Sequence, residues 1–233
     1  MLVHRIAVFG TKLNFMLVLF IIYGCSSINV SGLKEGDLLF VVNENGNNIT
    51  RVTQGVEGLG IDHVAVIADG NIIEAIPEYG VVESPLDSFL VRLSDGESVL
   101  VGRVKGLDVK ASVDNARRFL GLPYDDIFMP SDSTIYCSEL VQKSFVFKRR
   151  NQRLQRLECG GGDSNVCKLV FGTIPMSFHD STGNVTEFWT KFYAARGLVV
   201  PEGEPGTNPG QLSRDPNVKI LGFLAASALR QAQ

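Results

Sequence analysis

The sequence predicts an α+β domain in which an antiparallel sheet packs against one cysteine-bearing helix. Two apolar segments, 61–68 and 72–76, are joined by Asp69 and Gly70, a dipeptide typical of a two-residue β-hairpin turn. Further along the chain, apolar residues recur at helical spacing directly after Cys137. The hairpin therefore predicts the centre of the sheet, and Cys137 marks the start of the helix that covers it.

The composition is that of one ordinary globular domain. The chain has 233 residues, of which 45% are hydrophobic and 20% are charged. It shows no internal sequence repeat and no second hydrophobic core, so we expect a single domain over 34–233, with a C-terminal elaboration from about residue 169. Further strands are expected at 38–42, 81–83, 98–104, after 169 and at 218–224, and helices at 86–90, 112–120 and 188–193.

The first 24 residues have the features of a secretory signal peptide. His4, Arg5 and Lys12 precede an apolar run over 13–23, which is short for a membrane span. The letters IYGC at 22–25 resemble a bacterial lipobox, in which the cysteine is lipidated and becomes the first mature residue.

We therefore expect lipid attachment at Cys25, a tether over 25–33, and a lipid-anchored protein of the bacterial cell envelope that faces the periplasm. Tyr23 is an unusual residue for its position in a lipobox. Two alternatives remain open: a signal anchor that is not cleaved, and cleavage without lipid attachment.

Charge and cysteine content exclude some functions. The chain has 22 basic and 25 acidic residues, and removal of residues 1–24 takes away Arg5 and Lys12, which leaves 20 basic residues and a net charge of −5. This balance gives no reason to expect nucleic acid as a partner.

Cys159 and Cys167 flank a glycine-rich loop and are predicted to form a disulfide after export, with free thiols as the alternative. No metal site and no cofactor are expected, and we expect a monomer.

Cys137 is the candidate nucleophile. It lies where a polar segment, 130–133, gives way to the helical pattern, so it is expected at a helix N-terminus. Unpaired N–H groups and the helix dipole at that end stabilise a thiolate. The alternative is that Cys137 is a small buried apolar residue, which is the usual role of a free cysteine.

The hairpin provides candidate partners for a thiolate. With Asp69 and Gly70 as the loop, Ala65 lies opposite Glu74, and His63 shares a face of the sheet with Glu74 as its diagonal neighbour. Diagonal neighbours are about 7–8 Å apart at the backbone, within reach of two long side chains. A register shift of one residue would place them on opposite faces.

Other polar residues are weaker candidates. His179 lies in a loop segment without a neighbouring thiol in sequence, so we expect a surface or structural histidine. Asp37 is expected to form a turn. Asp62 and Glu139 flank the histidine and cysteine motifs, and either a supporting charge or a capping role is open for both.

Three motifs, in this order, carry a resemblance to a known family. They are GDLLF at 36–40, DHVAVI at 62–67 and YCSELV at 136–141. They resemble the NlpC-type papain-like cysteine hydrolases, in which the cysteine helix ordinarily comes first. The reversed order is similar to the circularly permuted branch, the YiiX/YaeF-like proteins and their lecithin retinol acyltransferase relatives. Supporting matches are IEAIP at 73–77, GLPYD at 121–125 and PMSF at 175–178.

The resemblance implies a permuted papain-like fold and a cysteine hydrolase of amide bonds. Cys137 would be the nucleophile, His63 the general base and acid, and Glu74 the residue that orients the imidazole, with Tyr124 as a candidate substrate-binding residue. A cell-wall peptide endopeptidase or amidase is the leading hypothesis. A lipid amidase or acyltransferase is the alternative within the permuted branch, and a catalytically silent binding module is the third. The aromatic residues of the tail and the loop 201–209 are candidates for one wall of a cleft.

Overall fold

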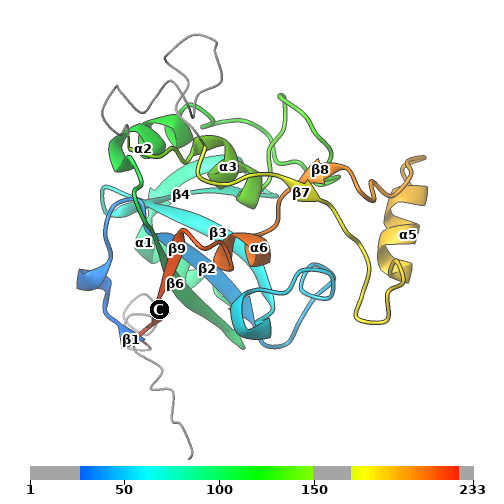
Figure 1. The fold of residues 1–233 in the computed structure, drawn as a ribbon, viewed down its shortest axis with the longest axis horizontal. Coiled ribbons are helices and arrows are strands. Elements are labelled where there is room, and N and C mark those ends of the chain that lie inside the picture. Colours follow the sequence, from blue (N-terminus) through cyan, green and yellow to red (C-terminus); the bar gives the residue numbers. More distant parts are fainter. Residues whose placement is uncertain (1–26, 149–168, 226–233) are drawn as a thin grey trace, which may run out of the picture.

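The structure is a computed structural model that describes residues 27–148 and 169–225. Its centre is a seven-stranded sheet in the order β1-β9-β6-β2-β3-β4-β5 (Figure 1). All neighbouring strands are antiparallel except β1 and β9, which are parallel. The strands are β1 (Ser27–Ile28), β2 (Leu38–Asn43), β3 (Ile61–Ala68), β4 (Asn71–Ile76), β5 (Gly80–Pro85), β6 (Glu97–Val104) and β9 (Val218–Leu224). The predicted α+β class is confirmed.

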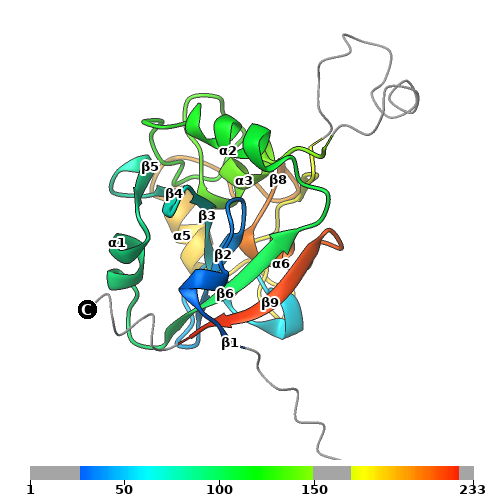
Figure 2. The ribbon, with the colours of Figure 1, turned by 90° about the vertical axis from the view of Figure 1, so that its left-hand side faces the viewer.

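Helices cover both faces of this sheet (Figures 1 and 2). On one face lie α2 (Val109–Arg117), α3 (Cys137–Ser144) and α6 (Pro209–Ser213), and on the other lies α1 (Leu86–Val91). The alternation of side chains along β2 divides the core accordingly: Leu38 and Phe40 face α3, whereas Leu39 and Val41 face α1. No helix within the described residues is both long and apolar enough to cross a membrane.

The hairpin between β3 and β4 has the predicted turn. Asp69 and Gly70 have φ of 49° and 81°, as a two-residue turn of this type requires. The strands pair through Val66 and Ile73 but no further, so Ala65 and Glu74 are not a paired position. β3 and β4 therefore separate at their outer ends, where His63 and Glu74 lie.

Two predicted boundaries were wrong. The helix expected at 112–120 begins at Val109, because the Asp108 side chain caps it by accepting a hydrogen bond from the Ala111 N–H at 3.2 Å. Residues 27–33, expected within a tether, contain β1 and a 3₁₀ turn (Val30–Gly32), with β1 held on the edge of the sheet by β9. The predicted signal peptide, Cys25 and the pair Cys159 and Cys167 lie outside the described residues.

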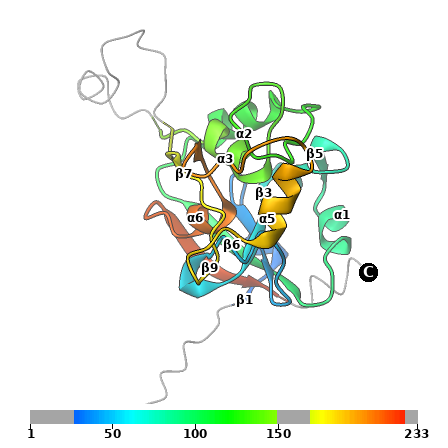
Figure 3. The ribbon, with the colours of Figure 1, turned by 90° about the vertical axis from the view of Figure 1, so that its right-hand side faces the viewer.

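The tail from residue 169 contributes one strand to the sheet, and it also forms a helix and a short two-stranded ladder outside the sheet. β9 occupies the predicted range and pairs with β6. α5 (Glu187–Ala194), the predicted aromatic helix, stands apart from the sheet in Figure 1 and lies in front of it in Figure 3. The predicted strand after residue 169 is limited to β7 (Ile174–Pro175), which pairs only with β8 (Pro205–Gly206).

The connection that carries Tyr124 is held against β5. Val81 donates from its backbone N–H to the Leu122 carbonyl at 2.9 Å and accepts from the Gly121 N–H at the same distance. A Cβ at Gly80 would lie 2.1 Å from that carbonyl oxygen, and Gly80 has a φ of 69°. Only glycine combines this backbone conformation with so close an approach.

Candidate active site

Cys137 is the first residue of α3 and is a free, buried thiol. Tyr136 is the N-cap residue of the helix; its backbone is extended, and its side chain makes no capping hydrogen bond. Leu140 and Val141 anchor the helix on the sheet, where α3 contacts β3 and β4. The N–H groups of the first turn therefore have no carbonyl partner within the helix, at the end of α3 where Cys137 lies.

His63 and Glu74 meet across the separated ends of β3 and β4. The imidazole Nε2 and the carboxylate Oε2 are 2.9 Å apart. The His63 side chain is 20% exposed and that of Glu74 is 1% exposed. The second carboxylate oxygen, Oε1, accepts a hydrogen bond from Arg92. The structure thus places the imidazole and the carboxylate on the shared face, as the hairpin register implied.

Cys137 is the other group that acts on the pKa of the His63 ring. Burial by itself lowers the pKa of His63, but the hydrogen bond from Cys137, the hydrogen bond to Glu74 and the charges of both groups raise that pKa from 6.5 to about 10. The imidazole is therefore protonated at neutral pH. An imidazolium next to sulfur favours the thiolate, which is the nucleophilic form of cysteine.

Glu74 is kept ionised by its two cationic neighbours. Burial raises its pKa, but the hydrogen bond to His63 and the charges of His63 and Arg92 outweigh burial and lower the pKa below its usual value of 4.5. A charged Glu74 stabilises the imidazolium form of His63 in turn. Glu74 and His63 are thus paired directly, and Cys137 acts on the same imidazole through its charge.

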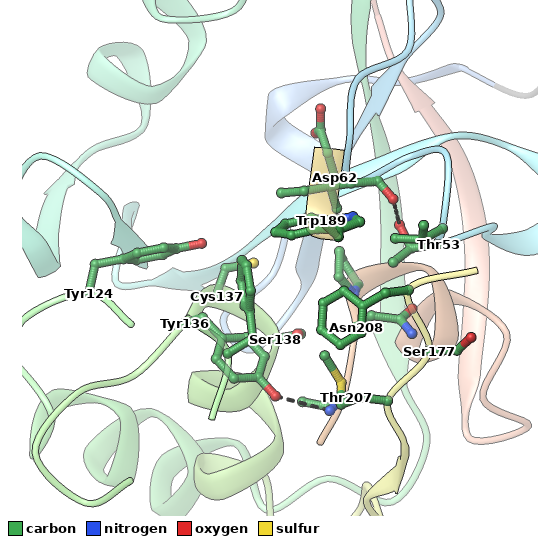
Figure 4. A pocket seen from close by; sticks show the side chains of 16 residues that line it. Thr53, Asp62, Tyr124, Tyr136, Cys137, Ser138, Ser177, Trp189, Thr207 and Asn208 are labelled. Carbon is green, nitrogen blue, oxygen red and sulfur yellow. Dashed lines mark hydrogen bonds between the residues drawn. The ribbon is translucent and has the colours of Figure 1, made fainter. Parts of the chain in front are cut away.

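A pocket opens beside Cys137 on the α3 side of the sheet (Figure 4). It is narrow, with a cavity volume of about 40 Å³. Among the residues that the structure describes, Asp62 is the only charged one in its lining, and no lysine, arginine or histidine lines it. The apolar part of the lining includes Ile49, Val52, Phe128, Met176, Phe178, Trp189 and Pro209.

Tyr124 and Tyr136 lie close to Cys137 in this pocket, as Figure 4 shows. Burial, followed by the charge of Cys137, raises the pKa of Tyr124 well above 10, so its hydroxyl stays protonated and can donate a hydrogen bond. The Tyr136 hydroxyl accepts a hydrogen bond from the Thr207 N–H at 3.0 Å, which ties the cysteine helix to the tail.

The structure keeps the weaker candidates out of the network. His179 pairs with Glu202 at 3.1 Å and does not line the pocket. Asp37 pairs with Arg103 at 2.7 Å and accepts from the Lys34 N–H, so its role is structural, as expected. Glu139 pairs with Lys143 at 2.9 Å within α3.

Asp62 and Arg92 add to the site in ways that the motifs did not specify. Asp62 lines the pocket and accepts hydrogen bonds from the side-chain amides of Asn43 and Asn47. Arg92, which the sequence analysis did not single out, contacts Glu74. From the sequence, Arg92 could only be placed after the helix predicted at 86–90. That position does not predict the direction of its side chain.

A thiol at a helix start, with an imidazole and a carboxylate paired on the strands beside it, is the arrangement of a papain-like cysteine hydrolase. The model of the family described as permuted papain-like amidase enzyme, YaeF/YiiX, C92 family, matches residues 32–222. The chain belongs to this family, which is one of cysteine peptidases and amidases.

The fold also resembles a solved structure, described as metalloprotein yiiX from Escherichia coli O157:H7. The identity is 23%, the TM-score is 0.57, and the alignment covers 81% of this chain and 96% of that chain. The comparison with curated proteins gives no match. Within residues 27–148 and 169–225, no three His, Cys, Asp or Glu side chains are grouped to hold a metal ion, so these residues do not fit a metal centre.

We predict that Glu74→Gln lowers the pKa of His63 from about 10, because the neutral amide no longer stabilises the imidazolium. The expected shift is at least about one pH unit. The measurement is an NMR titration of the His63 ring in the two proteins.

Glu97→Gln is the matched control. Glu97 lines the same small cavity as His63 and Glu74 but has no bond to the ring. An equal shift in both variants would mean that general charge, and not the Glu74 contact, sets the pKa of His63.

Proposed function

We propose that this protein is a cysteine amidase in which Cys137 is the nucleophile, His63 the general base and acid, and Glu74 the residue that orients and charges the imidazole. The single observation that supports it is that one imidazole contacts a buried carboxylate at 2.9 Å and has its pKa raised by the nearby Cys137 thiol. This is the arrangement that an activated thiol requires.

The reaction follows from these positions. The Cys137 thiolate attacks the amide carbonyl, and the developing oxyanion lies against N–H groups at the start of α3. His63 donates its proton to the leaving amine as the C–N bond breaks, which leaves a thioester on Cys137. His63 then takes a proton from water, whose oxygen attacks the thioester; the C–S bond breaks, the carboxylic acid leaves, and the Cys137 thiolate is restored beside the protonated His63.

We propose an apolar acyl group as the part of the substrate that enters the pocket. The walls next to the sulfur are mostly aliphatic and aromatic, and burial of a CH₂ group contributes about 0.8 kcal/mol. The Tyr124 hydroxyl would bind a polar atom near the scissile bond. The apolar chemistry of these walls favours an N-acyl amide.

The sequence analysis favoured cell-wall peptides, and the lining of the pocket supports the lipid-amide alternative instead. Cell-wall peptides carry carboxylates, which are usually bound by arginine or lysine. The described residues of the pocket include neither, and Asp62, the one charged side chain among them, is an anion that repels carboxylates.

We also propose that the enzyme acts as a monomer in the cell envelope, with Cys25 as a lipid attachment site. β1 begins at Ser27, two residues after Cys25, and lies at an edge of the sheet. Such a short connection would hold the domain close to the bilayer from which a lipid amide would come.

We predict that Cys137→Ala reduces amide hydrolysis at least about 1,000-fold, because the nucleophile is removed. The same variant should lose labelling by iodoacetamide at neutral pH. The combined variant Cys159→Ala, Cys167→Ala is the control and should keep both properties. Labelling that persists unchanged in Cys137→Ala would contradict the proposed mechanism.

We predict that Val52→Phe shortens the acyl chain that the enzyme accepts, because a larger ring would fill the narrow cavity. The ratio of kcat/KM between a long-chain and an acetyl amide of the same amine should fall at least about tenfold, as expected when about two CH₂ groups lose their contacts. Val91→Phe is the matched control, since Val91 is exposed and on α1. Hydrolysis of muropeptides without hydrolysis of N-acyl amides would overturn the substrate proposal.

We predict that Cys25→Ala abolishes incorporation of radiolabelled fatty acid into the protein expressed in a bacterium, because the acyl chains need the thiol. Fractionation should then recover the variant apart from membranes. Unchanged lipid incorporation would remove Cys25 as the attachment site.

A further inference from the structure

The carboxylate of Glu74 is held from two sides. Its residue is fully buried, and its two oxygens have different partners: Oε2 contacts the imidazole and Oε1 accepts from the Arg92 guanidinium. A buried carboxylate is costly unless both oxygens are hydrogen-bonded and its charge is balanced. The contact of Glu74 with Arg92 therefore affects its contact with His63.

Arg92 reaches Glu74 from the face of the sheet opposite to α3. It is the residue directly after α1, a helix that Leu86, Phe89 and Leu90 anchor on the sheet. Its guanidinium carbon lies 6.0 Å from the centre of the Phe89 ring, and the same ring lies 6.5 Å from the imidazole of His63. Phe89 thus packs beside both cations that contact Glu74.

We propose that Arg92 is a positioning residue for the catalytic network. Its guanidinium holds Oε1 of Glu74, which keeps the carboxylate ionised and keeps Oε2 directed at His63. The inference rests on the proposed function, in which His63 serves Cys137. Arg92 itself does not line the pocket beside Cys137; it lines the cavity that contains His63 and Glu74.

Charges around Glu74 determine what the loss of Arg92 would do. His63 on β3 and Arg92 after α1 stabilise the carboxylate. Asp62 on β3 and Glu97 on β6 line the same cavity, of about 160 Å³, and like charges there would oppose that of Glu74. Without Arg92, burial and these two carboxylates act against one remaining cation. Glu74 would then take up a proton at a higher pH, and a neutral Glu74 no longer supports the imidazolium.

The chain offers a matched control in Arg103 and Asp37. This pair also joins an arginine to a carboxylate that is 1% exposed, and the two arginine side chains have similar exposure, 33% for Arg103 and 42% for Arg92. Asp37 precedes β2 and has no contact with the network. Arg103→Gln therefore removes the same type of ion pair without touching Glu74.

The test compares three variants, Arg92→Gln, Arg92→Lys and Arg103→Gln, with the wild type. For each protein, kcat and KM for an N-acyl amide and the rate of Cys137 alkylation with iodoacetamide are measured from about pH 4 to about pH 10. We expect Arg92→Gln to move the acid limb of both profiles upward by about one unit and to lower kcat about tenfold at the acid end, with KM within about twofold. Arg92→Lys should restore most of the shift, because it keeps the charge. Arg103→Gln should lower thermal stability and leave both profiles in place.

Two outcomes would overturn the inference: an acid limb in Arg92→Gln that coincides with the wild-type limb, or an equal shift in Arg103→Gln. The alkylation profile needs no substrate, so it decides the role of Arg92 even if no amide is hydrolysed. Failure of the proposed function has a different signature, since His63→Gln would then leave the alkylation profile unchanged.

Discussion

The ion pair between His63 and the buried carboxylate of Glu74 is the interaction on which the site depends. Removing one partner of a buried pair typically costs about 3–5 kcal/mol, because the other charge is left without compensation. The lowered pKa of Glu74 stabilises the folded protein above 4.5, and this contribution is lost as the pH falls below that value. The raised pKa of His63 stabilises it below 6.5, and this contribution is lost as the pH rises through about 10. The pair therefore contributes most between these two ordinary values, 4.5 and 6.5.

The separation of β3 from β4 is what allows a network to pass from one face of the sheet to the other. Strand pairing ends at Val66 and Ile73, so the outer ends of the strands leave room for side chains between them. Cys137 approaches from the α3 face, and Arg92 approaches from the α1 face. Continuous pairing would fill this space with backbone hydrogen bonds, and the imidazole could not contact both the thiol and the carboxylate.

The tail gives the pocket its apolar character. Met176, Phe178 and Trp189 come from the C-terminal elaboration, yet they face Phe128, which precedes the cysteine helix. Phe128 has a φ of 51°, rare for a residue with a side chain, and its ring packs edge-on against Tyr136 and Trp189 at 5.3 and 5.8 Å. The sequence analysis named the tail aromatics as a candidate wall. It could not rank substrates, because the lining combines residues far apart along the chain.

Local sequence alone determined the α+β class, the hairpin turn at Asp69 and Gly70, the start of α3 at Cys137 and the shared face of His63 and Glu74. Each of these follows from short-range rules: side-chain alternation along a strand, turn chemistry and helical periodicity. Only the tertiary structure decided where strand pairing stops, which side chain meets the second oxygen of Glu74, and what lines the pocket. Those features depend on contacts between segments distant in sequence, and no local pattern encodes the direction in which Arg92 reaches across the sheet.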